Sequence, residues 1–263
     1  MYVQECFMSE NKPKKFRFNP RKVVAVLITV LCVLLAVGIG TWYHLENTDQ
    51  VIKAPKSAST AASATATPLP SDLTDPNSYQ YIVNKNIGVL SSSFVPGDLA
   101  DPENVTSTSG VITLRAEAAG KLTEMVKAAA DAGVNLYVTS AYRSYDEQEQ
   151  LYTSYSSLLK QSELIVSCAQ AGYSEHQLGL AADFTDDTSV SSQTEAFADT
   201  AAGQWLYQHA HEYGFILRYP KDKQSVTGFS YKPWHYRYVG TDTANAMYAV
   251  SPDETMEEYF NLK

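Results

Sequence analysis

Cysteine is scarce in this sequence, and its three occurrences are too dispersed to organise a fold. Cys6, Cys32 and Cys168 precede, interrupt and follow one long apolar run, so at most one of them lies in a folded domain beyond that run. A disulfide framework and a cysteine-ligated zinc site are therefore both excluded. Cys168 is most simply interpreted as a small buried residue.

Most of the chain has no excess of basic over acidic side chains. Residues 1–22 hold six basic and two acidic side chains, a net charge of +4, whereas the whole chain carries −9. The remaining residues therefore carry −13, which argues against nucleic acid or another polyanion as a partner. Hydrophobic residues make up 44% of the chain and no internal repeat is evident, so we expect most of it to be globular.

One long hydrophobic run lies near the N-terminus. Residues 23–42 contain no charged side chain, and a helix of that length spans about 30 Å, the thickness of a bilayer core. Basic residues precede the run, and Trp42 and Tyr43 end it. These flanks predict a membrane signal anchor at residues 23–43, with residues 1–22 cytoplasmic and the rest outside the cell membrane. A cleaved signal peptide is the alternative, but the run exceeds the ~7–15 residues of a signal-peptide core and no Ala-x-Ala-like site follows.

Residues 44–78 are dominated by alanine, serine, threonine and proline. Such a composition buries too little apolar surface to offset chain entropy, so it predicts a disordered linker. A random coil of roughly thirty residues has a root-mean-square span of about 30 Å. We expect the folded domain to occupy residues 79–263.

Helical and strand patterns alternate in this domain. An apolar helical period runs over residues 114–132, and the alternation at residues 134–140 predicts a strand. Ser144 to Glu147 form a capping box that opens a helix. Its expected buried side carries Leu151, Tyr152, Tyr155, Leu158 and Leu159. Weaker signals predict strands at 81–83 and 215–218, helices at 204–213 and 255–260, a loop at 185–200 and a turn at 221–227. Together they predict an α+β domain with an antiparallel sheet and flanking helices.

Two of the five histidines stand in a pattern that suits metal binding. His176 and Asp183 lie in one short segment, and His235 follows Trp234 some fifty residues later. Two imidazoles and one carboxylate form a zinc set that leaves a fourth position free, as catalytic zinc sites do. Because side chains alternate along a strand, Asp183 and His235 can face one pocket if their segments are extended.

The other three histidines do not suggest a metal site. His44 stands at the expected membrane exit. His209 and His211 are two residues apart on a predicted helix, so they project about 200° apart. We expect both to be surface or packing residues.

Several motifs occur in the order typical of one enzyme family. They are Ser140-Ala141-Tyr142-Arg143-Ser144-Tyr145, the Ser-x-His-x-x-Gly-x-Ala-x-Asp segment at 174–183, and the segments at 213–220 and 234–240. Over residues 79–262 the chain resembles the zinc D-alanyl-D-alanine carboxypeptidases of the VanY type, in the metallopeptidase group that also holds D-Ala-D-Ala dipeptidases. The resemblance implies a Zn²⁺ site at His176, Asp183 and His235. It also implies removal of the C-terminal D-alanine from a peptidoglycan stem peptide, with L,D-carboxypeptidase specificity as a variant.

The resemblance further implies roles for residues around the metal. Arg143 is expected to pair with the substrate carboxylate or the developing oxyanion. Ser174 and Gln148 either bind substrate or have capping and structural roles. One position departs from the family pattern, because the family carries a glutamate, the general base, three residues before the last histidine ligand, and this chain has Lys232 there.

Three interpretations of Lys232 remain open. A neutral Lys232 can act as a weak base, whereas a charged one can only stabilise the oxyanion. In the third interpretation Lys232 points to solvent and Glu175, the only nearby unassigned carboxylate, is the base. The sequence thus indicates either a membrane-anchored, extracytoplasmic zinc carboxypeptidase or a catalytically impaired relative that keeps zinc and binds stem peptides or cell-wall partners.

Overall fold

The computed structural model describes residues 70–186 and 193–262, so the expected tail, membrane anchor and most of the linker lie outside the described residues. Among the residues it describes, no helix combines the length and the apolar character that a membrane span needs. The predicted linker extends too far, because α2 (Pro70–Thr74) is helical and Leu73 packs against a hydrophobic cluster of the domain. The folded part therefore begins before residue 79.

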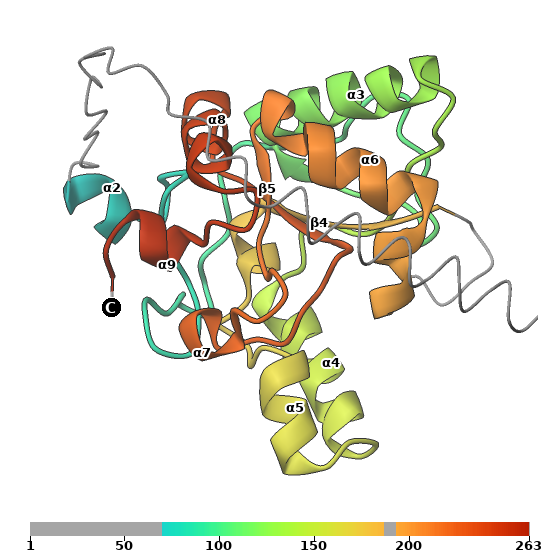
Figure 1. The fold of residues 1–263 in the computed structure, drawn as a ribbon. Helices are drawn as coiled ribbons and strands as arrows, with labels where there is room; N and C mark the ends of the chain where they lie inside the picture. Colours follow the sequence, from blue (N-terminus) through green and yellow to red (C-terminus); the bar gives the residue numbers. More distant parts are fainter. Residues whose placement is uncertain (1–69, 187–192, 263) are drawn as a thin grey trace, which may run out of the picture. The chain divides into compact units, whose positions relative to one another are not determined.

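A four-stranded antiparallel sheet organises the domain (Figure 1). Its strand order is β3 (Tyr137–Ser140), β4 (Ala181–Thr185), β6 (His235–Tyr238) and β5 (Phe215–Leu217). Strands β4, β5 and β6 are buried along their whole length, so both faces of the sheet are covered. A separate antiparallel pair joins β1 (Leu99–Ala100) to β2 (Leu114–Arg115). The predicted α+β class with an antiparallel sheet is confirmed.

Helices cover the sheet and extend from it. α3 (Ala116–Asp131) and α6 (Ala201–His209) lie together at one end, whereas α4 (Tyr145–Ser156) and α5 (Gln161–Ser167) form a hairpin that projects at the opposite end (Figure 1). The remaining helices are α7 (Gln224–Thr227), α8 (Thr241–Val250) and α9 (Met256–Tyr259), with single turns of 3₁₀-helix at η2 (Glu175–Leu178), η3 (Glu195–Asp199) and η4 (Ala210–Tyr213).

Several local predictions are confirmed with their physical causes. The apolar period of α3 buries Leu122, Met125 and Ala129 completely. The capping box of α4 is formed, because the Ser144 hydroxyl accepts from the Glu147 amide and the Glu147 carboxylate accepts from the Ser144 amide at 2.9 Å. The helical stretch ending in η4 stops where Gly214 takes a φ of 84°, a left-handed conformation that favours glycine.

Other local predictions are wrong. Residues 81–83 are buried but pair with no strand, because their backbone runs as a loop over the core. The predicted loop at 185–200 contains η3, and the predicted turn at 221–227 contains α7. By contrast, the C-terminal helix predicted at 255–260 is confirmed, because α9 has Thr255 as its N-cap. Helices α5 and α8 carried no predictive signal.

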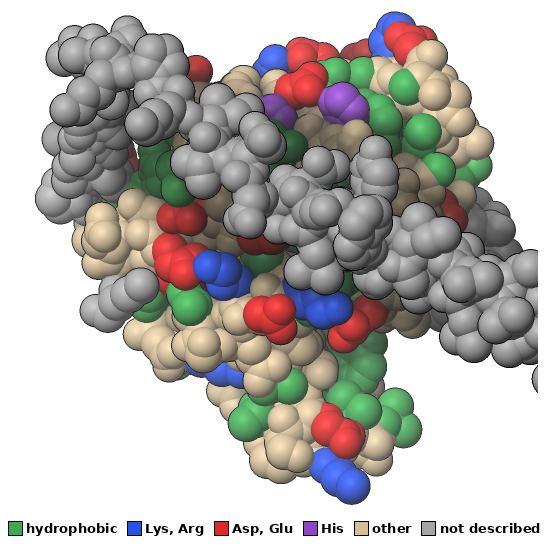
Figure 2. Space-filling view, in the orientation of Figure 1, with side chains coloured by type: hydrophobic (Ala, Val, Ile, Leu, Met, Phe, Trp, Pro, Cys, Tyr) green, Lys and Arg blue, Asp and Glu red, His purple; other side chains and the backbone are tan. Residues whose placement is uncertain are grey.

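The core has two parts. The larger cluster fills the space between the sheet and helices α3 and α6, with fully buried residues such as Leu114, Leu206 and Phe215. The smaller cluster lies beneath α8 and α9 and includes Ile82 and Met256. On the face shown in Figure 2, acidic and basic side chains are interspersed, without a large patch of one sign.

Candidate metal centre and substrate cavity

The strand register brings three polar side chains into one row. Asp183 on β4 pairs with Ser140 on β3 and with His235 on β6. A register shift between Val138 and Ser140 places Ser140 opposite Asp183, a local bulge of the kind that re-aims side chains near functional sites. Directly opposed residues have Cβ atoms about 4.5–5.5 Å apart. The two candidate ligands on strands therefore meet as the sequence predicted.

His176 reaches the same place from outside the sheet. It lies in η2, which ends at Gly179 with a φ of 65° before the chain enters β4. This turn favours glycine for its φ, and a Cβ at Gly179 would also lie 2.9 Å from a methyl carbon of Leu99, which would have to shift. The resulting geometry places the His176 and His235 rings 5.1 Å apart, centroid to centroid.

Asp183 lies between the two imidazoles. Its Oδ2 is 3.3 Å from His176 Nε2, and its Oδ1 is 2.8 Å from His235 Nδ1. One ligand atom from each of the three residues lies within 4.8 Å of the others, and all three side chains are buried. The sequence-predicted metal ligands are therefore brought together.

The protonation of His176 fits a metal ligand. Its Nδ1 is 2.6 Å from the Ala141 carbonyl oxygen, which can only accept, so Nδ1 carries the proton and Nε2 presents a lone pair to Asp183. Burial, with a smaller contribution from the Arg143 charge, lowers the pKa of His176 and favours the neutral ring. Burial alone would raise the pKa of Asp183, but His176 and His235 hold it well below its usual range. Neutral imidazoles and a carboxylate are the donor set that zinc takes.

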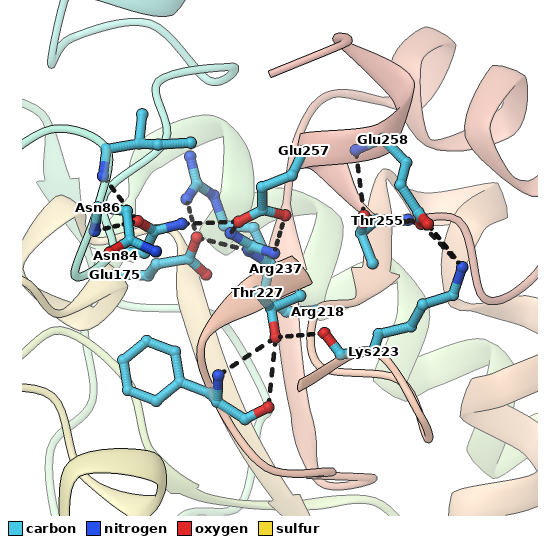
Figure 3. Close-up of polar contacts among 12 residues, drawn as sticks. Asn84, Asn86, Glu175, Arg218, Lys223, Thr227, Arg237, Thr255, Glu257 and Glu258 are labelled. Carbon is cyan, nitrogen blue, oxygen red and sulfur yellow. Dashed lines mark hydrogen bonds and ion pairs between the residues drawn. The ribbon is translucent and has the colours of Figure 1, made fainter. Parts of the chain in front are cut away.

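A buried ionic cluster adjoins the metal ligand His235 through Glu175, and Figure 3 shows its members Glu175, Arg218, Arg237 and Glu257. Oε1 of Glu175 accepts from Arg218 Nε at 2.7 Å and from Arg237 Nη1 at 2.9 Å. Arg218 also donates to both carboxylate oxygens of Glu257, at 2.9 and 2.7 Å. Burial opposes ionisation of Glu175, but the two arginines hold its pKa well below its usual range. Glu175 is therefore a fixed anion, which contradicts the interpretation that makes it the general base.

Arg143 enters the cavity next to the metal ligands. Its backbone N–H donates to the His176 carbonyl at 3.2 Å, and its guanidinium donates to Gln148 Oε1 at 2.7 Å and to Ser140 Oγ at 2.5 Å. Gln148 is buried and donates from Nε2 to the Ala169 carbonyl at 2.7 Å, so it is held from both sides. Within the described ranges no carboxylate pairs with Arg143. Ser174 is buried, lines the cavity and makes no side-chain cap bond.

The cavity has a volume of about 400 Å³. Polar residues, the three metal ligands and Arg143 among them, line part of it. Aromatic and apolar side chains line the rest: Leu151, Tyr155, Leu159, Tyr219, Phe229 and Trp234. Three of these belong to the apolar stripe that the sequence assigned to the buried side of the helix. That assignment is wrong, because α4 projects from the sheet and buries only Gln148, so its apolar stripe forms a cavity wall.

The interpretation with Glu175 as the base also required Lys232 to point to solvent. Lys232 instead lines this cavity, so that interpretation is wrong in both parts. Its Nζ lies 5.1 Å from the Tyr219 ring centroid and 5.0 Å from that of Phe229. Burial lowers the pKa of Lys232, and the charge of Asp183 opposes that shift. Across residues 70–186 and 193–262 no carboxylate forms an ion pair with its ammonium group.

The structure also tests what the sequence predicted for the other histidines and for Cys168. His209 pairs with Glu212 at 2.9 Å and His211 stacks on Tyr248, so both are surface or packing residues as expected. Cys168 is buried as expected, but it also lines the cavity. His44 lies outside the described residues.

Sequence reasoning missed the ionic cluster. Arg218 and Arg237 lie within the family motifs, yet the motifs alone assign them no role. The available signal was a charged residue inside an apolar strand segment, since a fully buried arginine requires a partner. Glu257 carried no comparable signal, because it lies far away in the sequence on a short helix.

Comparison with known proteins places this site in context. A family model described as "VanY: D-alanyl-D-alanine carboxypeptidase" matches residues 111–241. YodJ of Bacillus subtilis (strain 168), which its name places among the carboxypeptidases, is 39% identical over 189 residues, covering 71% of this chain and 68% of YodJ.

Two solved structures extend the likeness to the fold. The LdcB LD-carboxypeptidase has a TM-score of 0.65 and 38% identity, covering 72% of this chain and 88% of that one. A mutant of a vancomycin-resistance D,D-pentapeptidase VanY, in complex with Zn(II), has a TM-score of 0.57 and 29% identity, covering 70% of this chain and 99% of that one.

Proposed function

Because the chain belongs to the VanY family of D-alanyl-D-alanine carboxypeptidases, which are zinc metallocarboxypeptidases, we propose that it removes the C-terminal D-alanine from peptidoglycan stem peptides. One observation carries this proposal. Arg143, a cation without a carboxylate partner among the described residues, lines the same cavity as the metal ligands His176, Asp183 and His235. A carboxypeptidase needs this pairing, because it recognises a terminal carboxylate beside the bond that it cleaves.

Arg143 supplies the recognition. A guanidinium can bind a carboxylate through two parallel N–H···O bonds, which fixes both the position and the orientation of the peptide end. Gln148 and Ser140 hold the guanidinium in place before substrate arrives, so little side-chain entropy remains to be lost on binding. Gln148 thus positions Arg143, and Ser174 offers a hydroxyl at the cavity wall.

The three ligands supply the reactive centre. His176, Asp183 and His235 would hold the zinc ion, which would supply a Lewis acid that activates water and polarises the scissile carbonyl. His176 offers Nε2 because its Nδ1 proton is committed to Ala141. The aromatic and apolar walls lower the local dielectric, which strengthens the electrostatic interactions inside the cavity.

Lys232 favours a second candidate function. The carboxylates among the described cavity residues are Asp183 and Glu175, and both are committed, one to the metal site and one to two arginines. With an ammonium group in place of the family glutamate, proton transfer is impaired while peptide binding is not. The second candidate is therefore a zinc-containing domain that binds stem peptides or other cell-wall ligands with little turnover.

One assay separates the two functions. The purified full chain, loaded with zinc, is incubated with a stem peptide ending in D-Ala-D-Ala, and released D-alanine is measured together with peptide affinity. Release that is abolished by a chelator and by His235→Ala supports the carboxypeptidase. Binding without release supports the second candidate, and absence of both refutes the two together.

Substrate choice between pentapeptides and tetrapeptides is tested in the same assay. The likeness to the LdcB LD-carboxypeptidase makes L,D-cleavage of a tetrapeptide the specific alternative to D,D-cleavage. A peptide ending in L-Lys-D-Ala is compared at equal concentration with one ending in D-Ala-D-Ala. Faster release from the tetrapeptide would show that the enzyme is an L,D-carboxypeptidase and not a D,D-carboxypeptidase.

We also propose that the chain acts outside the cytoplasm while anchored to the membrane. The uncharged run at residues 23–42, with basic residues before it, supports this placement. Protease added to intact, wall-free cells should remove the domain and leave the N-terminal tail protected. A domain that stays protected contradicts the proposed orientation.

A further inference from the structure

Two buried polar atoms beside the metal centre face each other without any other partner among the described residues. They are Glu175 Oε2 and His235 Nε2, which lie 3.6 Å apart. The side chains are 0% and 5% exposed, respectively. Buried polar groups are normally hydrogen-bonded, and such a facing pair indicates a specific role.

The Glu175 carboxylate cannot turn away from His235. Its other oxygen, Oε1, accepts from Arg218 and Arg237 at 2.7 and 2.9 Å. Arg218 is held in turn by Glu257 (Figure 3), and Arg237 donates to the Tyr81 carbonyl at 2.9 Å. The cluster therefore presents Oε2 to His235 as a fixed acceptor.

We propose that Glu175 is a positioning residue that keeps the His235 proton on Nε2 and so presents Nδ1 to zinc. Both ring nitrogens of His235 face carboxylate oxygens, which can only accept: Nδ1 lies 2.8 Å from Asp183 Oδ1, and Nε2 lies 3.6 Å from Glu175 Oε2. A zinc ion held with Asp183 would take the lone pair of Nδ1, and the proton would then lie on Nε2, toward Glu175. A carboxylate in this position also raises the basicity of the ligand.

The two histidines thus reach the metal through opposite nitrogens. His176 is fixed by the Ala141 carbonyl and offers Nε2, whereas His235 is fixed by Glu175 and offers Nδ1. The Ala141 acceptor is backbone, so side-chain substitution does not remove it. Glu175 is a side chain, and its role can be tested. The inference rests on the zinc site and not on the identity of the substrate.

Glu175→Gln tests the role. The two arginines keep the amide oxygen of the new side chain on their side, so its NH₂ group faces His235 Nε2. A donor there disfavours a proton on Nε2 and shifts it to Nδ1, where it blocks metal binding. Zinc affinity of the full chain, measured by competition with a chromophoric chelator, should fall by about 10- to 100-fold.

Glu257→Gln is the matched control. It makes the same chemical change in the same ionic cluster and on the same arginine, but Glu257 has no contact with His235. We expect this variant to lose stability in thermal unfolding while keeping the wild-type zinc affinity. Equal loss of zinc affinity in the two variants would make the effect merely structural and overturn the proposal.

A measurement on the wild type decides the matter even if Glu175→Gln fails to fold. Nitrogen-15 NMR of the zinc-loaded full chain reports which nitrogen of His235 carries the proton. We expect a slowly exchanging proton on Nε2. A proton on Nδ1, with Nε2 bound to the metal, would overturn the proposal whatever the enzymatic activity.

Discussion

Replacing Lys232 by glutamate is the sharpest test of how this cavity works. The backbone at this position is well fixed, because the Lys232 amide donates to the Tyr219 carbonyl and its carbonyl accepts from the His235 amide, both at 3.1 Å. A substitution therefore changes the side chain without shifting the metal ligand. The new carboxylate would start from the same cavity wall and supply the proton acceptor that the described cavity otherwise lacks.

The expected gain in catalytic rate is large compared with the expected loss of folding stability. A positioned general base contributes about 10²–10⁴-fold to rate, which corresponds to about 2.7–5.4 kcal/mol of barrier. Lys232→Glu also loses two cation–π contacts, to Tyr219 and Phe229, each worth about 1 kcal/mol at a partly buried site. That loss of about 2 kcal/mol should lower the melting temperature by about 4–8 °C in a domain of this size.

The assay is the initial rate of D-alanine release at saturating zinc, expressed as kcat/KM. Lys232→Gln is the matched control, because it removes the positive charge without supplying a base. We expect Lys232→Glu to exceed the wild type by at least about 100-fold. Lys232→Gln should stay near the wild-type rate. The reasoning is refuted if the wild type is the fastest of the three, since Lys232 itself would then promote the reaction.

Three further predictions follow from the geometry. Arg143→Lys should lower kcat/KM by about 10- to 100-fold, because an ammonium cannot replace the bidentate fork; unchanged kinetics would exclude Arg143 from carboxylate binding. Gly214→Ala should lower the free energy of unfolding in urea by more than about 1 kcal/mol, because the residue has φ 84° and its Cβ would lie 2.5 Å from a Tyr238 ring carbon; equal stability would contradict the left-handed turn at this position. Cys168 should react slowly with iodoacetamide, because burial raises its pKa, and more slowly still with peptide bound; peptide mapping that shows no protection would remove Cys168 from the cavity wall.

The metal centre could be predicted from the sequence because it depends on strand alternation. Asp183 and His235 lie in extended segments whose side chains alternate, so each segment presents its ligand to one face. The pairing of these two residues across β4 and β6 realises that expectation. The turn at Gly179 between His176 and the strand was not predicted, although glycine is the residue that most readily adopts its φ of 65°.

What covers an apolar surface could not be predicted in the same way. The period of Leu151, Tyr155 and Leu159 indicates a helix with one apolar side, but periodicity does not tell whether that side meets the core or a cavity. Here the helix projects from the sheet, so the stripe faces the cavity. The same limit applies to Glu257, because its pairing with Arg218 depends on how the C-terminal helix packs.

The location of positive charge in the cavity connects binding with turnover. The chain as a whole carries −9, yet Arg143 and Lys232 are both cations without carboxylate partners within the described cavity. A cavity with low-dielectric walls concentrates the field of such charges, so an anionic peptide is attracted locally despite the acidic surface. Lys232 strengthens that attraction but cannot accept a proton while it is charged. A glutamate there would accept the proton and repel the peptide carboxylates. A single residue therefore sets the balance between holding the peptide and cleaving it, and a gain in kcat for Lys232→Glu should be accompanied by weaker peptide binding.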